Sequence, residues 1–593
     1  MENSEKIQLS IGLFLVLLLI ASTAWSTSFF ADDLGFDFAG YAVRYTSTFS
    51  GWVKNHHMGL PASTFDAWLP ALLPLFFKFF GLGSFTGPLE ISILLMKLLL
   101  VAGIVFLARE YKIPIATAFL IGAIVAVNPI TFKFLNRYYE LFAWVSFLFA
   151  AVYFRRYINS TNKAQSLFFA VLFSIITLLS HFTPALFLAL LAVFSLKPEL
   201  PEIKKLVVLG IFSAGISLFW LGPFVAYSGY SGITSFDSSA LQTLGMTAAS
   251  AFLILLLTAA NFLCFKLGLH KKYRRETQLL ALTTVLAVIK FAAPWLPLLN
   301  RPFTHSFHFF YIIVLSIIAM VFIKESKKLS VFASKKMIYL SALVLLIPAF
   351  FFLPKIIGNY AFIEPRFSTY ELEGEKVGFA EIDAMLKTIS KAERFEVLPQ
   401  DPIVNAFAMV RYDLSTAYGW GYNIVALSNS NEKIIRLAQS IKESCELFNK
   451  SSREFGISKW IALSREAFRD LAGCGWKESR DRAPALFSMS GNEATAIIEN
   501  GELAEYANTR LIVNAKPPGT LLKINYFPRW SAYSGTQKTG IVAEAKNNFV
   551  FIPVLEEKTV QLKYENTAID AISLLASMVF FGSFMFFLRH SLA

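Results

Sequence analysis

The chain has 593 residues, of which 55% are hydrophobic and 16% charged, and its formal net charge is +13. Soluble domains average roughly 45–50% apolar and about 25% charged residues, so this composition indicates a polytopic membrane protein. The positive charge does not indicate a nucleic-acid-binding protein. Residues 355–565 carry 26 Lys and Arg against 26 Asp and Glu, so this long segment is neutral. The excess of Lys and Arg lies instead in short loops between apolar segments, which is typical of membrane topology.

Twelve apolar runs are long enough to predict membrane spans. In chain order they fall near residues 9–30, 88–108, 113–129, 140–154, 164–180, 184–196, 206–226, 243–265, 277–294, 306–323, 337–354 and 568–588. The predicted fold class is therefore a polytopic α-helical membrane protein of about twelve spans. A cleaved signal peptide is the alternative for the first run, but a single lysine precedes that run and it continues apolar to Phe30.

A thirteenth apolar segment, residues 67–81, is short and contains two prolines and a lysine. We interpret it as a helix lying in the membrane interface, within a first outside loop of residues 31–87. The positive-inside rule supports this choice, because the basic loops then all share the side of the N-terminus; they are residues 155–163, 197–205, 266–276 and 324–336. We therefore predict that both termini are cytoplasmic and that residues 355–566 are extracytoplasmic.

The predicted domains are a transmembrane domain (1–354), an extracytoplasmic α/β subdomain (355–505), an extracytoplasmic β-rich subdomain (506–566), and a final transmembrane helix with a cytoplasmic tail (567–593). In the α/β subdomain, helical spacing at 379–392 and 432–448 alternates with strand patterns at 395–398 and 458–464. In the β-rich subdomain, successive strand patterns are separated by turn signals, which predicts a β-sandwich.

Acidic, basic and histidine residues gather in the loops predicted to lie outside. They are Asp32, Asp33 and Asp37 in the first loop, Arg137 and Glu140 in the second, His181 at a later turn, and Lys290, Arg301, His305 and His308 near the fifth. A carboxylate accepts a proton from an attacking hydroxyl, and Arg and Lys hold phosphate, so this set indicates chemistry on an anionic, lipid-linked substrate.

The same residues also have structural interpretations. A loop carboxylate is often only solvated or paired with a nearby base such as Arg44, and Arg137 with Glu140 has the spacing of a helix-surface pair. His181 precedes a helical segment and would then serve as its cap. Lys97, in the middle of a predicted span, is left unassigned.

These motifs, in this order, resemble the GT-C class of integral-membrane glycosyltransferases over nearly the whole chain. The segments that carry the resemblance are "DDLGFDFAGYAVRY" (32–45), "MGLPASTFDAWLPALLPLFFKFFGLGS" (58–84), "NRYYELFAW" (136–144), "LLSHFTPALFLALLAVF" (178–194), "LFWLGPFV" (218–225), "NRPFTHSFHFFYIIVL" (300–315) and "LLKINYFPRWSAYSG" (521–535). The chain departs from the class at Asp37, where many relatives carry a histidine four residues after the loop acid, and it has no clear "WWD" motif of the oligosaccharyltransferase branch.

The resemblance implies a cell-envelope enzyme of the cell membrane that transfers a sugar from a polyprenyl-phosphate or polyprenyl-diphosphate carrier to a glycan, lipid or protein acceptor, with no nucleic-acid partner. Asp33 or Asp32 would be the general base, and Glu140 would orient the acceptor or a metal. Arg301, Lys290 or Arg137 would hold the leaving phosphate, to which His181, His305 and His308 would donate hydrogen bonds. Asp37 with Asp33 would bind a divalent cation, Mg²⁺ or Mn²⁺; no cofactor beyond this cation is implied.

Two other classes of function fit the sequence. A transporter or flippase for lipid-linked sugars would show internal repeat symmetry, of which no clear sign is present. A non-catalytic envelope scaffold would use the outer domain for assembly.

In the predicted outer domain, Trp420 and Trp530 are either stacking platforms for sugars or core residues. Cys445 and Cys474 are placed to form a disulfide on the oxidising side, and Asn449 begins a glycosylation signal.

Overall fold

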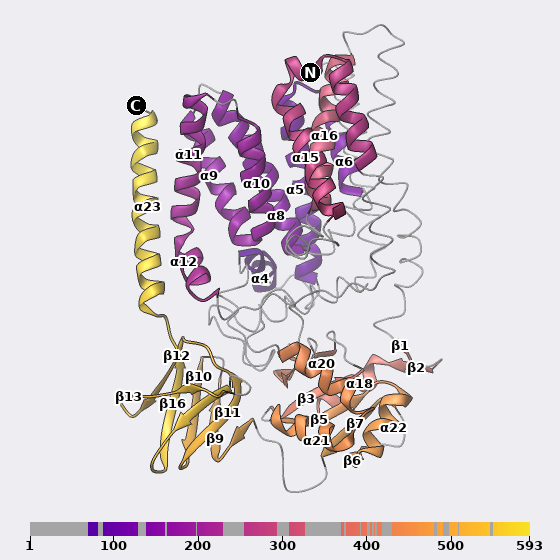
Figure 1. Ribbon diagram of the computed structural model, residues 1–593, viewed down its shortest axis with the longest axis vertical. Helices are drawn as coiled ribbons and strands as arrows, with labels where there is room; N and C mark the ends of the chain where they lie inside the picture. The colour runs from indigo at the N-terminus through magenta and orange to yellow at the C-terminus, as the bar shows by residue number, and fades with distance from the viewer. Residues whose placement is uncertain are drawn as a thin grey trace.

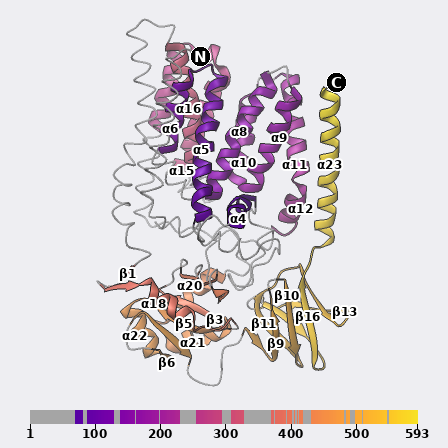
Figure 2. The same ribbon diagram turned by 180° about the vertical axis from the view of Figure 1, so that it is seen from behind.

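The computed structural model is a bundle of helices that stands over two units containing the β-sheets (Figure 1). It describes residues 69–80, 87–127, 138–159, 163–196, 199–228, 254–292, 307–326, 369–372, 375–391, 393–399, 404–405, 408–409, 412–417, 430–479, 483–489, 497–507, 509–545 and 549–592. We call the end of the bundle nearest the sheets the domain end and the opposite end the far end. The C-terminal helix α23 leaves the sheets and runs beside the bundle to the far end (Figure 2).

The helices of the bundle follow the predicted apolar runs. They are α5 (Gly87–Glu110), α6 (Ile115–Val127), α8 (Tyr138–Asn159), α9 (Lys163–Ser180), α10 (Phe182–Phe194), α11 (Leu200–Ile216), α12 (Leu218–Ala226), a helix at Ile254–Lys266, α14 (Leu269–Lys272), α15 (Arg274–Ala292), α16 (Phe307–Ser326) and α23 (Ala568–Leu592). The largest buried core of the described residues lies among α5, α6, α8, α10, α15 and α16.

Three of the described helices are long and apolar enough to cross a membrane, through Ile91–Glu110, Glu140–Asn159 and Ala568–His590, and α11 with α12 makes a fourth if the pair is one broken span. Their length and composition are those of a membrane protein. The count of twelve spans stays a prediction. The predicted runs 9–30 and 337–354 lie outside the described residues.

The segment predicted to lie in the membrane interface forms a 3₁₀ turn, Leu69–Ala71, and the short helix α4, Leu72–Phe79. Figure 1 shows α4 nearly end-on at the domain end, so it lies across the direction of the bundle. Phe76, Phe79 and Phe80 are 54%, 86% and 60% exposed. A short apolar helix with exposed aromatic rings, placed crosswise at the end of a bundle, has the form of an interfacial helix.

Helices α11 and α12 are bent by 71° where they meet at Ser217. A break inside a membrane leaves backbone groups that must be satisfied within the protein. Here the Phe219 N–H donates to the Ser577 Oγ of α23 at 2.6 Å. Gly215 allows the close approach, because a Cβ at this position would overlap the Phe580 ring of α23. Helix α23 therefore packs directly against the broken pair.

The first extramembrane unit is an α/β fold. Its five-stranded sheet has the order β4-β3-β5-β7-β6, with β4 (Ser415–Thr416), β3 (Arg394–Leu398), β5 (Ile457–Ala462), β7 (Ala485–Met489) and β6 (Trp476–Glu478). Strands β3, β4 and β5 are parallel, and β7 is antiparallel to its neighbours. The helices are α18 (Phe379–Leu386), α20 (Ser430–Ser440), α21 (Cys445–Glu454) and α22 (Arg465–Gly473), and a hairpin of β1 (Thr369–Leu372) and β2 (Glu375–Gly378) precedes them.

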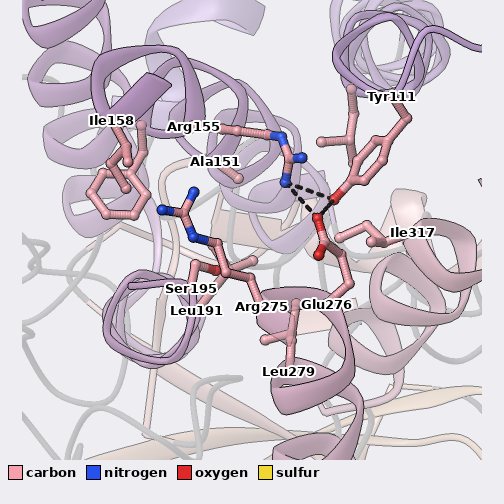
Figure 3. Close-up of a pocket in the computed structure, with 12 residues that line it drawn as sticks. Tyr111, Ala151, Arg155, Ile158, Leu191, Ser195, Arg275, Glu276, Leu279 and Ile317 are labelled. Atoms are coloured by element: carbon pink, nitrogen blue, oxygen red, sulfur yellow. Dashed lines mark hydrogen bonds and ion pairs between the residues drawn. The ribbon is translucent and has the colours of Figure 1, made fainter. Parts of the chain in front are cut away.

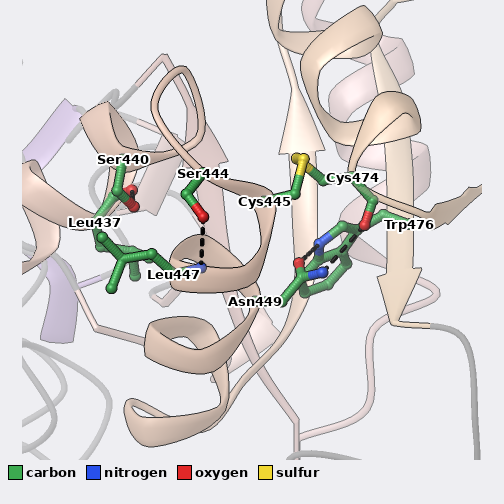
Figure 4. Close-up of a disulfide and its surroundings, with 8 residues drawn as sticks. All are labelled: Leu437, Ser440, Ser444, Cys445, Leu447, Asn449, Cys474 and Trp476. Atoms are coloured by element: carbon green, nitrogen blue, oxygen red, sulfur yellow. Dashed lines mark hydrogen bonds between the residues drawn. A yellow bond between two sulfur atoms is a disulfide. The ribbon is translucent and has the colours of Figure 1, made fainter.

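The single helix expected over residues 432–448 is wrong, because the chain forms α20 and α21 with a turn between them. Ser444 begins the second helix as its N-cap, and its hydroxyl accepts from the Leu447 N–H at 3.3 Å. The predicted disulfide is confirmed: Cys445, the first residue of α21, is bonded to Cys474 (Figure 4). The bridge ties the start of α21 to the end of α22.

The second unit is a sandwich of two antiparallel sheets with the orders β13-β12-β16-β10-β9 and β14-β15-β11-β8. The strands are β8 (Ile498–Glu499), β9 (Gly501–Tyr506), β10 (Arg510–Ala515), β11 (Gly519–Asn525), β12 (Trp530–Ser534), β13 (Gln537–Thr539), β14 (Val542–Ala543), β15 (Phe549–Pro553) and β16 (Lys558–Tyr564). The sandwich begins at Ile498 rather than at residue 506, because β8 pairs with β11 and β9 with β10.

Buried polar contacts connect these units to each other and to the bundle. Arg394 of β3 is fully buried and donates to the main-chain oxygen of Lys523 in β11 at 2.8 Å. Below the bundle, Arg529 of the sandwich pairs with Asp570 of α23, and the hydroxyls of Tyr227 and Thr567 are 2.7 Å apart. The sandwich is therefore fixed to α12 and α23 at the domain end.

Candidate functional site

Of the predicted site residues, Glu140 and His181 are described with their side chains. Lys290 and His308 are placed only through the backbones of α15 and α16. Six others lie outside the described residues: Asp32, Asp33, Asp37, Arg137, Arg301 and His305. Their roles stay predictions.

Three helices that begin at the domain end are held together by aromatic rings. Trp144 of α8 stacks on Phe187 of α10 with ring centroids 6.0 Å apart, and Phe187 stacks on Phe310 of α16 at 4.8 Å. Trp144 and Phe310 are fully buried. Because a helix rises 1.5 Å per residue, the first turns of α8, α10 and α16 lie within one to two turns of this aromatic cluster.

Each of these helices carries a predicted site residue at its beginning. Glu140 is one turn before Trp144, His181 immediately precedes α10, and His308 is two residues before Phe310. Lys290 lies near the last turn of α15, which packs against α16 and ends where α16 begins. The fold therefore gathers four of the ten predicted residues at one end of the bundle, the end that faces the extramembrane units (Figure 1).

Glu140 is 3% exposed, in the first turn of α8. The carboxylate is therefore not solvated on the surface of α8; Arg137, its predicted partner, lies outside the described residues, so the pair stays a prediction. A buried carboxylate requires compensation, and the N-terminus of a helix supplies part of it through the helix dipole. Tyr138 and Trp144, both fully buried, flank it on the same helix. Glu140 therefore lies in a buried environment between two aromatic side chains at the start of α8.

His181 is the N-cap of α10, as its structural interpretation predicted. Its Nδ1 accepts from the Thr183 N–H at 3.2 Å, and its backbone is extended. Because Nδ1 accepts, the proton of the neutral imidazole is on Nε2. Capping therefore fixes the tautomer in which Nε2 is a hydrogen-bond donor, which is the form needed to contact a phosphate oxygen.

No group of three or more His, Cys, Asp or Glu residues is close enough to hold a metal ion within the part of the chain that the structure describes. Asp33 and Asp37, the predicted cation ligands, are not in that part. The Mg²⁺ or Mn²⁺ site stays a prediction that rests on the first loop alone.

The outer domain offers one clear correction. Trp530 is 3% exposed and packs edge-on against Tyr564 at 5.4 Å in the sandwich core, so it is a core residue and not a stacking platform. Trp420 lies outside the described residues.

Asn449, the first residue of the predicted glycosylation signal, accepts from Trp476 Nε1 at 2.8 Å and donates to the Cys474 carbonyl at 3.1 Å, so its amide is engaged inside the fold (Figure 4). This packing disfavours a glycan on Asn449.

Sequence reasoning missed a polar pocket at the far end of the bundle. Arg155 Nη1 donates to Glu276 Oε1 and to the Tyr111 hydroxyl, each at 2.9 Å, and the hydroxyl donates to the same carboxylate oxygen at 3.1 Å (Figure 3). Burial raises the pKa of Tyr111, so the phenol stays protonated. No local pattern indicates this cluster, because Arg155 is 44 residues from Tyr111 and 121 residues from Glu276.

No protein-family model matches the chain, and no curated protein matches it in sequence. Among solved structures, the chain matches the cryo-EM structure of the arabinofuranosyltransferase AftD from mycobacteria with a TM-score of 0.50 and 10% sequence identity. The match covers 93% of this chain and 57% of that one, so this chain spans somewhat more than half the length of AftD. At this identity the likeness shows the fold, and the predicted resemblance to the GT-C class of membrane proteins is confirmed at that level.

Proposed function

We propose that this chain is a membrane glycosyltransferase that moves a sugar from a polyprenyl-phosphate or polyprenyl-diphosphate carrier to an extracytoplasmic acceptor. The observation that carries the proposal is the GT-C fold, shared with a glycosyltransferase over 93% of the chain. The arrangement of Glu140, His181 and His308 at the starts of three packed helices supports it, because these residue types suit a phosphate and a hydroxyl substrate.

In the proposed reaction, Asp33 or Asp32 accepts the proton of the acceptor hydroxyl while its oxygen attacks the anomeric carbon. The bond from that carbon to the carrier phosphate oxygen breaks, and the phosphate leaves with the electron pair. Single displacement inverts the configuration of the anomeric carbon. Arg301, Lys290 or Arg137 balances the growing negative charge on the phosphate, and the Nε2–H of His181 donates to one of its oxygens.

Glu140 orients the acceptor hydroxyl in this proposal. The reacting groups would be on the extracytoplasmic side, with both termini in the cytoplasm. Lys290 and His308 lie on the same end of the bundle as Glu140, which is the placement the proposed reaction requires.

Transfer from a radiolabelled polyprenyl-phosphate sugar to an acceptor mixture, with purified protein in proteoliposomes, tests the proposal. Asp33→Asn should lower transfer at least about 100-fold, the usual effect of removing a general base, while Asp66→Asn in the same loop should leave it near wild type. Equal rates for the two variants would contradict the role of Asp33. Movement of intact lipid-linked sugar across the bilayer without transfer would identify a flippase, and neither activity would leave a scaffold.

Sidedness has a separate test. Cys264 is buried and is the one free cysteine, so a Cys264→Ser background accepts single cysteines for labelling. New cysteines at His56 and at Leu267 should react with a membrane-impermeant maleimide from opposite sides of the membrane. Labelling of both from one side would overturn the proposed topology.

A further inference from the structure

The far-end pocket lies between helices α8, α10 and α15, at the end of the bundle opposite the candidate site. Arg155 enters it from α8 and Arg275 from the start of α15, and Ser195 lies at its edge after α10 (Figure 3). Most of the remaining wall is apolar, including Leu191, Leu279 and Ile317. The Glu276 carboxylate also lines the pocket, where Arg155 and Tyr111 donate to it. The pocket thus combines guanidinium groups, hydroxyls and one paired carboxylate with a surface suited to methylene groups.

The two guanidinium groups differ in how their donors are used. Arg155 is engaged by Glu276 and Tyr111. Arg275 forms an ion pair with Glu202 through Nη2 and donates to Asn159 Oδ1 at 3.2 Å through Nη1. Its Nε is buried and has no acceptor among the described residues. A buried donor without a partner is destabilising, so an anionic oxygen that accepts from this N–H would be stabilised in the pocket.

The surroundings of the pocket favour an anion. The described residues 109–112, 155–159, 163, 199–205, 266–276 and 324–325 hold thirteen Lys and Arg against five Glu. Several of the cations are already paired, including Arg156 with Glu110 at 2.8 Å and Lys272 with Glu325 at 2.5 Å. The excess of positive charge remains, and it is concentrated on the side that the positive-inside rule assigns to the cytoplasm.

We propose that this pocket binds the phosphate group of an anionic phospholipid from the adjoining leaflet, with Arg275 Nε and the Ser195 hydroxyl as donors to the phosphate oxygens and an acyl chain along Leu191 and Leu279. Basic pockets between transmembrane helices on the cytoplasmic side are established binding places for anionic lipid head groups. The site is separate from the candidate glycosyltransferase site, which is at the other end of the same helices.

Native mass spectrometry of the full-length protein, with equal amounts of phosphatidylglycerol and phosphatidylcholine, tests this proposal. Wild-type protein should retain phosphatidylglycerol at least about tenfold more strongly, because phosphatidylcholine carries the same phosphate but adds a trimethylammonium group, which the surrounding cations repel. Arg275→Gln should remove most of this preference. Lys271→Gln, an exposed cation of the same loop that does not line the pocket, is the matched control and should keep it.

Two further variants keep the test independent of whether Arg275→Gln folds. Glu202→Gln releases Arg275 from its carboxylate and should strengthen retention of phosphatidylglycerol. Leu191→Trp fills the pocket without changing any charge and should weaken it. Equal retention by Leu191→Trp and wild type, or equal loss in Arg275→Gln and Lys271→Gln, would overturn the proposal. Displacement of phosphatidylglycerol by millimolar inorganic phosphate would show that the site takes free phosphate rather than a lipid.

Discussion

Replacement of Arg394 by methionine should loosen the joint between the two extramembrane units. Arg394 is fully buried, and its guanidinium donates to the main-chain oxygens of Phe455 at 2.5 Å and Lys523 at 2.8 Å. Burial lowers the pKa of Arg394, while Tyr506 and Glu396 oppose this effect, and a guanidinium stays charged in any case. The side chain therefore joins the α/β sheet to the sandwich through charge-assisted hydrogen bonds.

The magnitude follows from what methionine leaves behind. Methionine fills most of the volume but donates nothing, so two buried carbonyls lose a donor and Glu396 loses its electrostatic interaction with the guanidinium. Removal of one member of a buried charged set typically costs about 3–5 kcal/mol. For extramembrane units of this size, such a loss lowers the melting temperature on the order of 10 °C.

Scanning fluorimetry of the detergent-solubilised protein measures the melting temperature, and hydrogen exchange of β3 and β11 should become faster in the variant. Arg510→Met is the matched control, because Arg510 is half exposed and pairs with Glu505 at 3.4 Å on the sandwich surface. An exposed pair contributes about 0–1 kcal/mol. If Arg394→Met and Arg510→Met melted within about 2 °C of each other, the buried guanidinium would not be what holds the two units together.

Three further outcomes are expected. Gly215→Leu should destabilise the packing of α23 by about 1–3 kcal/mol through overlap, while Gly210→Leu on the same helix, where a Cβ meets nothing within 4 Å, should have little effect on the melting temperature. Burial, and then the hydrogen bond to Glu325, raise the pKa of Tyr273 to about 12, so its neutral phenol stabilises the fold fully below pH 10 and loses this effect towards pH 12. The difference in melting temperature between wild type and Tyr273→Phe should therefore shrink between pH 10 and pH 12. A constant difference would contradict the assignment. His181→Asn should keep the helix cap and the melting temperature but lower sugar transfer at least about tenfold, whereas wild-type transfer by this variant would confine His181 to capping.

Apolar periodicity predicted the bundle helices because the bilayer requires long runs of apolar residues with internally satisfied backbones. It failed where short-range hydrogen bonds decide the structure. The pattern across residues 432–448 continues through Ser444, but the hydroxyl of Ser444 begins a new helix there. Likewise, β8 is two residues long and is a strand only because β11 pairs with it, so no local pattern announces it.

Residue types alone nominated the candidate site residues, but they did not predict how the helices that carry those residues pack together. Glu140 and His181 are 41 residues apart, and the contact that brings their helices together is made by Trp144 and Phe187, which sequence analysis did not single out. The burial of Glu140 depends on neighbours from other helices, which no local pattern reveals. The same limit hid the far-end pocket, whose residues looked like ordinary basic loop ends.

The direction of each helix connects the chemistry of the two ends. A helix that begins at the domain end presents its positive dipole end there and its negative end at the far end. Helix α8 accordingly carries Glu140 in its first turn and Arg156 in its last, and α23 carries Asp570 first and Arg589 last. In these two helices a carboxylate is therefore less costly to bury at the domain end, and a guanidinium group is less costly to bury at the far end. Helix α15 runs the other way and begins at the far end, so its dipole favours Glu276 in the first turn there, while the guanidinium of Arg275 depends on its ion pair with Glu202.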